Sequence, residues 1–103
     1  MDCNKVSYSH DTGWQDITGG YAKWRKKNGV IYLLIYNTTN TSGGWTSLGK
    51  LPTEAVPDYT VYNTIFSNGA TIYVEGTTSG DPGNINYNGS AINGGFTFCW
   101  LKD

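Results

Sequence analysis

Apolar and polar residues alternate along most of this chain in short runs, and turn residues separate the runs. The segments "YAKWRKK" and "VIYLLIYN" flank Asn28–Gly29, and "YTVYNTIFS" and "ATIYVEG" flank Asn68–Gly69. The Asn-Gly pair suits two-residue hairpin turns, because both of its positions tolerate positive φ. The pattern therefore predicts two β-hairpins, one around each pair.

Further short strands are expected at 14–18, 45–48, 84–87 and 96–101. No stretch has helical spacing over a useful length, and Thr, Val, Ile and Tyr are enriched. Many short strands between turn signals predict an all-β fold, a small antiparallel β-sandwich or barrel. A chain of 103 residues has room for one such domain. We expect it to span residues 13–103, with residues 1–12 as an N-terminal segment or junction to an upstream stalk.

Residues 30–36, "VIYLLIY", depart from the alternation because they are apolar on both faces of the expected strand. An antiparallel strand with one solvated face alternates. Either this strand is central, with both faces covered by its own chain, or one face packs against another subunit. The small size of the domain favours the homo-oligomer.

Two of the three prolines lie in one connection, at Pro52 and Pro57. Each proline fixes its own φ near −65° and biases the preceding residue toward extended geometry. Residues 51–58 are therefore expected to form a stiff crossover without a helix.

Composition excludes several classes of function. The net charge is −1, which gives no overall electrostatic footprint for nucleic acid. The run "KWRKK" places Lys23, Arg25 and Lys27 on one face of a strand. This pattern indicates a solvated strand face rather than a phosphate-binding site. No apolar run is long enough for a membrane span, so no membrane insertion is expected.

Templates for catalysis and for metal binding fit poorly. His10 lies between Ser9 and Asp11, but neighbours on an extended chain point to opposite faces and cannot form a triad. The spacing of the eight acidic residues singles out no pair for glycoside hydrolysis. Two cysteines and one histidine are too few for a metal set, so we expect no enzyme, no metal and no cofactor. Cys3 and Cys99 meet only if the first and last strands are neighbours.

Binding is better supported, because aromatic residues make up 15% of the chain and eight of them are tyrosines. A ligand site needs an apolar floor with a few placed polar groups. Trp24 with Arg25 and Tyr87 with Asn86 offer such pairs near turns, and Asp81 lies in the polar, glycine-rich segment 76–95. These five residues are the predicted ligand-binding set. The competing interpretation is that most of the tryptophans pack in the core.

The segment "GWTSLGKLPTEAVPDYTVY", with "GWQDIT", "YAKWRKKNGVIYLLIY" and "GGFTFCW" in order around it, resembles the C-terminal receptor-binding, or head, domains of bacteriophage tail fibres and baseplate proteins and of related prophage tail proteins. The resemblance covers residues 13–100. The chain departs from the pattern at Val56, where the family carries an arginine before the proline. If that arginine takes part in host recognition, the receptor here differs.

The resemblance implies a β-sandwich of jelly-roll type, a homotrimer around a three-fold axis, and non-catalytic binding of a bacterial cell-surface polysaccharide. It also implies a place in the virion, at the tail tip or baseplate, after assembly in the cytoplasm of the bacterial host. The missing signal peptide and the end of the chain after the last strand agree with this expectation. The alternatives are a structural tail or baseplate module without receptor binding, and a carbohydrate-binding module of a secreted bacterial enzyme.

Overall fold

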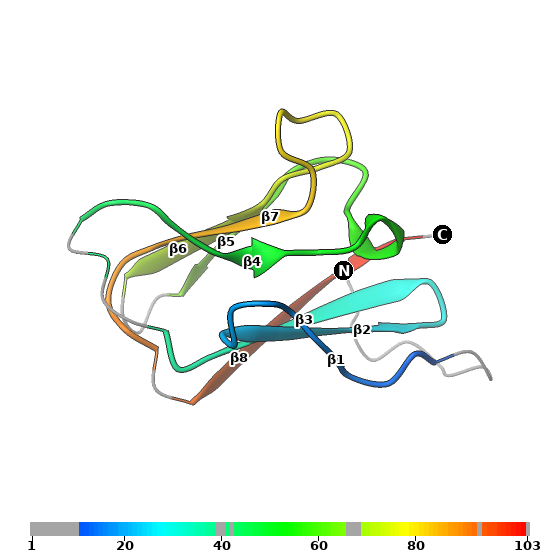
Figure 1. Cartoon of the computed structure of the whole chain (residues 1–103), viewed down its shortest axis with the longest axis horizontal. Helices are drawn as coiled ribbons and strands as arrows, with labels where there is room; N and C mark the ends of the chain where they lie inside the picture. Colours follow the sequence, from blue (N-terminus) through cyan, green and yellow to red (C-terminus); the bar gives the residue numbers. More distant parts are fainter. Residues whose placement is uncertain (1–10, 39–40, 42, 66–68, 93, 103) are drawn as a thin grey trace.

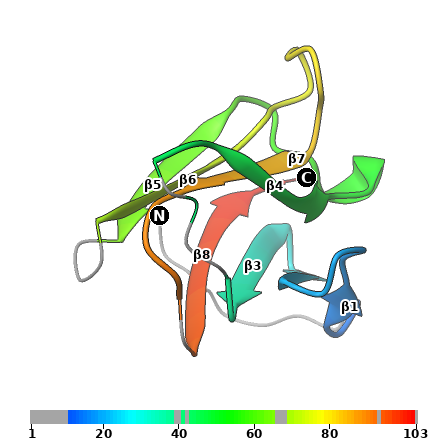
Figure 2. The same cartoon turned by 60° about the vertical axis from the view of Figure 1, so that its left-hand side comes forward.

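The computed structural model describes residues 11–38, 41, 43–65, 69–92 and 94–102. The described strands form two four-stranded antiparallel sheets that lie one above the other (Figures 1 and 2). They are β1 (Gln15–Asp16), β2 (Ala22–Lys27), β3 (Val30–Tyr36), β4 (Thr46–Lys50), β5 (Val61–Ile65), β6 (Ala70–Val74), β7 (Asn84–Asn88) and β8 (Gly95–Leu101). The expected all-β fold is confirmed, and the two packed sheets are the sandwich form of that expectation.

The first sheet has the strand order β1-β2-β3-β8. Its β2–β3 hairpin is the one expected around Asn28–Gly29, where φ is 54° at Asn28 and 76° at Gly29. Both values are positive, as a type I′ turn requires. The second hairpin, β5–β6, also forms as expected, with φ of 72° at Gly69; Asn68 lies outside the described residues.

The position of strand β3 accounts for its unusual sequence. It lies between β2 and β8, and the residues of one face belong to the core that the two sheets share. Ile31, Leu33 and Ile35 point into the core and have no exposed surface. Tyr32 and Leu34, on the opposite face, are half-buried. Strand β3 is therefore central in its sheet, but its own chain covers one face and leaves the other half-buried, so the homo-oligomer stays a prediction.

The second sheet has the strand order β4-β7-β6-β5. Strands β5, β6 and β7 follow one another as antiparallel neighbours, and β4 reaches the far side of β7 through the long connection from Leu51 to Thr60. This arrangement is a Greek key, the connection found in most β-sandwiches. The jelly-roll type, which needs a particular pairing of two such motifs, stays a prediction.

The crossover at residues 51–58 contains one turn of 3-10 helix, η1 (Thr53–Ala55), so the expectation of a crossover without a helix was wrong. Pro52 has φ −69°, which suits the start of such a turn, and the amide of Ala55 donates to the carbonyl of Pro52 at 2.9 Å. Pro57 is among the fully buried side chains. The two prolines thus bracket one tight turn that packs into the protein.

The core lies between the facing sides of the two sheets. It contains alternate residues of β3, β6, β7 and β8, as the two-residue period of strands requires. Its largest fully buried side chains are Tyr87, Ile31, Leu33, Ile35, Ile72 and Ile85. At one end of the sandwich, η1 lies close to the end of β8 (Figure 1), where Trp100 Nε1 donates to the carbonyl of Ala55 at 3.3 Å.

The N-terminal part of the described chain is attached to the first sheet. The amide of Thr12 donates to the carbonyl of Lys26 at 2.9 Å, and Asp11 pairs with Lys27. Contacts with the sheet therefore begin before residue 13. Cys99, on β8, is part of a disulfide. Cys3 and His10 lie outside the described residues.

Candidate functional site

Three aromatic side chains gather on the outer face of the second sheet, away from the core. Trp45, just before β4, is 52% exposed, and Tyr62, on β5, is 70% exposed. Both contact Tyr73 of β6, with ring centroids 5.0 Å apart for Trp45 and 5.2 Å apart for Tyr62. We call Trp45, Tyr62 and Tyr73 the aromatic patch. Aromatic rings exposed together in this way are typical of binding surfaces.

Strand register explains why these side chains meet. Tyr62 pairs with Tyr73, Tyr73 pairs with Asn86, and Asn86 pairs with Ser47, so one row of residues crosses all four strands. Residues paired across neighbouring strands point to the same face. The next residues along β6, Ile72 and Val74, are fully buried, which fixes Tyr73 on the outer face.

A polar network adjoins the aromatic patch. Glu75 Oε2 accepts hydrogen bonds from the side-chain amides of Asn84 at 3.4 Å and Asn86 at 3.2 Å. Asn84 Nδ2 also donates to Asn86 Oδ1 at 3.0 Å, and Ser47 Oγ donates to Asn84 Oδ1 at 2.6 Å. We call Ser47, Glu75, Asn84 and Asn86 the amide cluster. Each of its amide groups is oriented by a partner, so the cluster is held in one arrangement.

The amide cluster is also tied to the backbone beneath the aromatic patch. Asn86 Nδ2 lies 3.4 Å from the carbonyl of Tyr73, and the amide of Glu75 donates to the carbonyl of Asn84 at 3.1 Å. Asn86 is only 8% exposed, and its contacts satisfy its buried polar atoms. Its role in this geometry is to position Glu75 next to Tyr73.

The five sequence-predicted site residues do not come together in one place. Trp24 is 5% exposed and Tyr87 is fully buried, so both side chains pack in the core. Asn86 and Tyr87 lie within β7, not in a loop, and their side chains point to opposite faces of the sheet. Of the five, Asn86 belongs to the amide cluster. The geometry supports ligand binding least for Trp24 and Tyr87.

Arg25 lies on the outer face of the first sheet and is engaged by neighbours. Its Nε donates to Asp11 Oδ1 at 2.9 Å, a second guanidinium nitrogen contacts Asp11 Oδ2, and the guanidinium lies 5.9 Å from the ring centroid of Trp14. The hydrogen bonds from Arg25 and from the amide of Gly13 hold the pKa of Asp11 well below its usual range. This cluster fastens residues 11–14 to β2.

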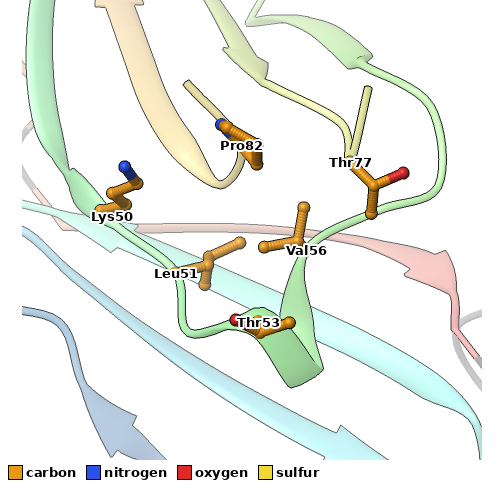
Figure 3. Close-up of a pocket in the computed structure, with 6 residues that line it drawn as sticks. All are labelled: Lys50, Leu51, Thr53, Val56, Thr77 and Pro82. Atoms are coloured by element: carbon orange, nitrogen blue, oxygen red, sulfur yellow. The ribbon is translucent and has the colours of Figure 1, made fainter. Parts of the chain in front are cut away.

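Asp81 forms a 2.5 Å ion pair with Lys50 and precedes Pro82, and Lys50 and Pro82, but not Asp81, line a hollow of about 380 Å³. Leu51 and Val56 make the apolar floor of the hollow, and Pro82 lies opposite them (Figure 3). The remaining lining residues are Lys50, Thr53 and Thr77. The hollow reaches the lower size limit of ligand sites but presents no aromatic ring. It is therefore the weaker of the two candidates.

Sequence reasoning missed all three members of the aromatic patch. In "ATIYVE", Tyr73 falls on the face opposite Ala70, Ile72 and Val74, so the alternation already marks it as outward-facing. Tyr62 alternates with Val61 in the same way. For Trp45 the sequence carries no such signal, because this residue follows two glycines and precedes the strand.

The patch and the cluster together can hold a polyhydroxylated ligand. Exposed aromatic rings offer an apolar surface for the C–H faces of a sugar ring, and neighbouring amide and carboxylate groups exchange hydrogen bonds with its hydroxyls. Within the described residues, no helix is long and apolar enough to cross a membrane, and no three His, Cys, Asp or Glu side chains are grouped to hold a metal ion. Comparison of the chain with protein-family models, with curated proteins and with solved structures finds no match.

Proposed function

We propose that this domain binds saccharide without catalysis, as the receptor-binding domain of a phage tail that attaches to a polysaccharide on the host cell surface. The single observation that carries the saccharide-binding part is the aromatic patch, with two rings more than half exposed, directly beside the amide cluster. The phage-tail part rests on the ordered sequence resemblance over residues 13–100. The homotrimer, the jelly-roll type and the place in the virion belong to the same proposal.

A carbohydrate-binding module of a secreted enzyme is the second candidate. The disulfide at Cys99 agrees with it, because disulfides persist in secreted proteins and are rare in the cytosol. Proteins exposed on virions also carry disulfides, so the bond is compatible with both candidates. The two share one binding site and differ in the chain to which the domain is attached.

The test uses the exposed tryptophans as a matched pair. Wild type, Trp45→Ala and Trp14→Ala are applied to an array of bacterial surface polysaccharides and to a panel of whole bacterial strains. Trp14 is 42% exposed but lies by Arg25 on the first sheet, so its substitution controls for loss of a surface tryptophan. We expect Trp45→Ala to weaken binding at least about tenfold, which is ~1.4 kcal/mol, and Trp14→Ala to retain it.

Two results would contradict the proposal. One is that the wild-type domain binds no polysaccharide and no strain. The other is that Trp45→Ala binds as tightly as wild type, which would remove the aromatic patch from the site. Circular dichroism of each variant confirms that the fold is retained, and the surface position of Trp45 makes a large loss of stability unexpected.

A further inference from the structure

Glu75 is a carboxylate without a positively charged partner among the described residues. The ion pairs there use Asp11, Asp16, Asp58 and Asp81. The hydrogen-bond donors to Glu75 are the neutral amides of Asn84 and Asn86, and both end on Oε2. Neutral donors orient a carboxylate but leave its negative charge in place.

This charge lies beside the aromatic patch. Glu75 directly follows β6 and lies two residues after Tyr73, and its carboxylate meets the side chains of Asn84 and Asn86 on the same face of the second sheet. Asn86 Nδ2 contacts both, at 3.2 Å from Glu75 Oε2 and 3.4 Å from the carbonyl of Tyr73. The site thus combines aromatic rings with a fixed, half-buried carboxylate.

Lys50, the charged residue paired with Asn84 of the amide cluster, does not neutralise Glu75. Lys50 pairs in register with Asn84, on the amide-cluster side of β7, but its ammonium is bound to Asp81 at 2.5 Å. That pair contributes no net charge. Within the part of the chain that the structure describes, no ion pair therefore neutralises the negative charge of Glu75.

We infer that the site selects saccharides that carry a positively charged amino group, and that this ammonium binds between the carboxylate of Glu75 and the rings of the aromatic patch. Aromatic faces attract cations, and an ammonium gives a carboxylate stronger hydrogen bonds than a hydroxyl does. An acidic saccharide would place a like charge next to Glu75, which disfavours it. The inference rests on the proposed saccharide binding and specifies its ligand class.

The test compares two ligands that differ in that charge and in the acetyl group that replaces it, and the salt dependence isolates the part due to charge. A β-1,4-linked glucosamine tetramer and its N-acetylated counterpart are titrated against wild type by calorimetry, at low and at high salt. Acetylation removes the positive charge from each amine. We expect wild type to bind the glucosamine tetramer at least about tenfold more tightly at low salt, and this preference to shrink at high salt because ions screen exposed charges.

Two variants locate the effect. Glu75→Gln removes the charge but keeps a side chain of the same size, and it should reduce the preference to about twofold or less. Glu54→Gln makes the same change at an exposed residue of η1 and should leave the preference at the wild-type value. The comparison of the two tetramers on wild type tests the inference even if Glu75→Gln does not fold.

The outcomes separate this inference from the proposed function. Equal affinity for the two tetramers, or binding of neither by a domain that does bind polysaccharides on the array, overturns the selection of amino sugars and leaves saccharide binding standing. An unchanged preference in Glu75→Gln overturns the role of Glu75. A domain that binds no polysaccharide at all fails both proposals.

Discussion

Substitutions at Tyr87 test whether this residue packs in the core, as the structure shows, or binds ligand, as the sequence analysis predicts. The side chain is fully buried beneath the second sheet, and its hydroxyl donates to the carbonyl of Ser90. Truncation of a buried aromatic residue to alanine costs about 3–5 kcal/mol. Loss of one hydrogen bond costs about 1 kcal/mol. Tyr87→Ala should therefore lose about 3–5 kcal/mol of unfolding free energy, and Tyr87→Phe about 1 kcal/mol.

These values are a large part of the stability of a small domain, which is typically about 5–15 kcal/mol. At about 4–8 °C per kcal/mol, Tyr87→Ala should lower the Tm by at least about 12 °C. Urea unfolding, followed by tryptophan fluorescence, measures the free energies. Tyr62→Ala is the matched control, because this tyrosine is 70% exposed on β5 and its loss should cost about 1 kcal/mol or less.

The binding assay completes the test. Tyr87→Phe should keep the wild-type affinity for saccharide, whereas Tyr62→Ala should weaken it. If Tyr87→Ala unfolds at the same urea concentration as wild type, the described packing of the core around Tyr87 is wrong. If a folded Tyr87→Phe loses most of its affinity, Tyr87 acts in the site and the burial argument fails.

Two other substitutions test the stability of the frame. Asp11→Asn should lower the free energy of unfolding at pH 7, and the loss should shrink as the pH falls, because Arg25 depresses the pKa of Asp11 in the folded state. The stabilisation by ionised Asp11 is complete above the pKa of about 3.9 in the unfolded chain. It is lost as the pH drops toward the lower pKa of the folded protein. Urea midpoints at pH 7 and pH 2 check this, with Asp16→Asn as control, and a difference that does not shrink contradicts it. Pro57→Gly should cost about 2 kcal/mol or more, since the ring is fully buried, and leave the affinity of the folded fraction unchanged. A large loss of affinity in this variant would place the crossover in the site.

Most of the fold follows from local patterns. Alternation and turn residues predict the strands and both hairpins, because side-chain direction in a strand depends only on position along it. Which strands become neighbours depends on contacts between residues far apart in sequence. The placement of β4 beside β7 and of β8 beside β3 therefore has no signature in the sequence. The 3-10 turn at Thr53–Ala55 was missed for a different reason, because three residues are too few to give a periodic signal.

The candidate site was less predictable, since it is assembled from four strands. The sequence prediction pairs Asn86 with Tyr87 in one site, although consecutive strand residues face opposite sides and Asn86 is only 8% exposed. The same alternation separates Trp24 from Arg25. If the alternation rule is applied to every strand, it places Tyr62 and Tyr73 on the outer face of the second sheet and Tyr87 on the face toward the core. The meeting of Tyr73 with Trp45 needs the register of three strands, which only the structure provides.

The location of the candidate site on strands has a consequence for the proposed recognition of a ligand. Loops usually carry binding groups and tolerate change. Here Tyr73 lies on the outer side of β6 and Glu75 directly follows that strand, whose inner residues Ile72 and Val74 have no exposed surface. The packing that stabilises the sandwich therefore also fixes the ring and the carboxylate, so little ordering is required when ligand binds. A rigid face of this kind distinguishes ligands by the position of their charges and hydroxyls, because it does not rearrange to fit those that differ.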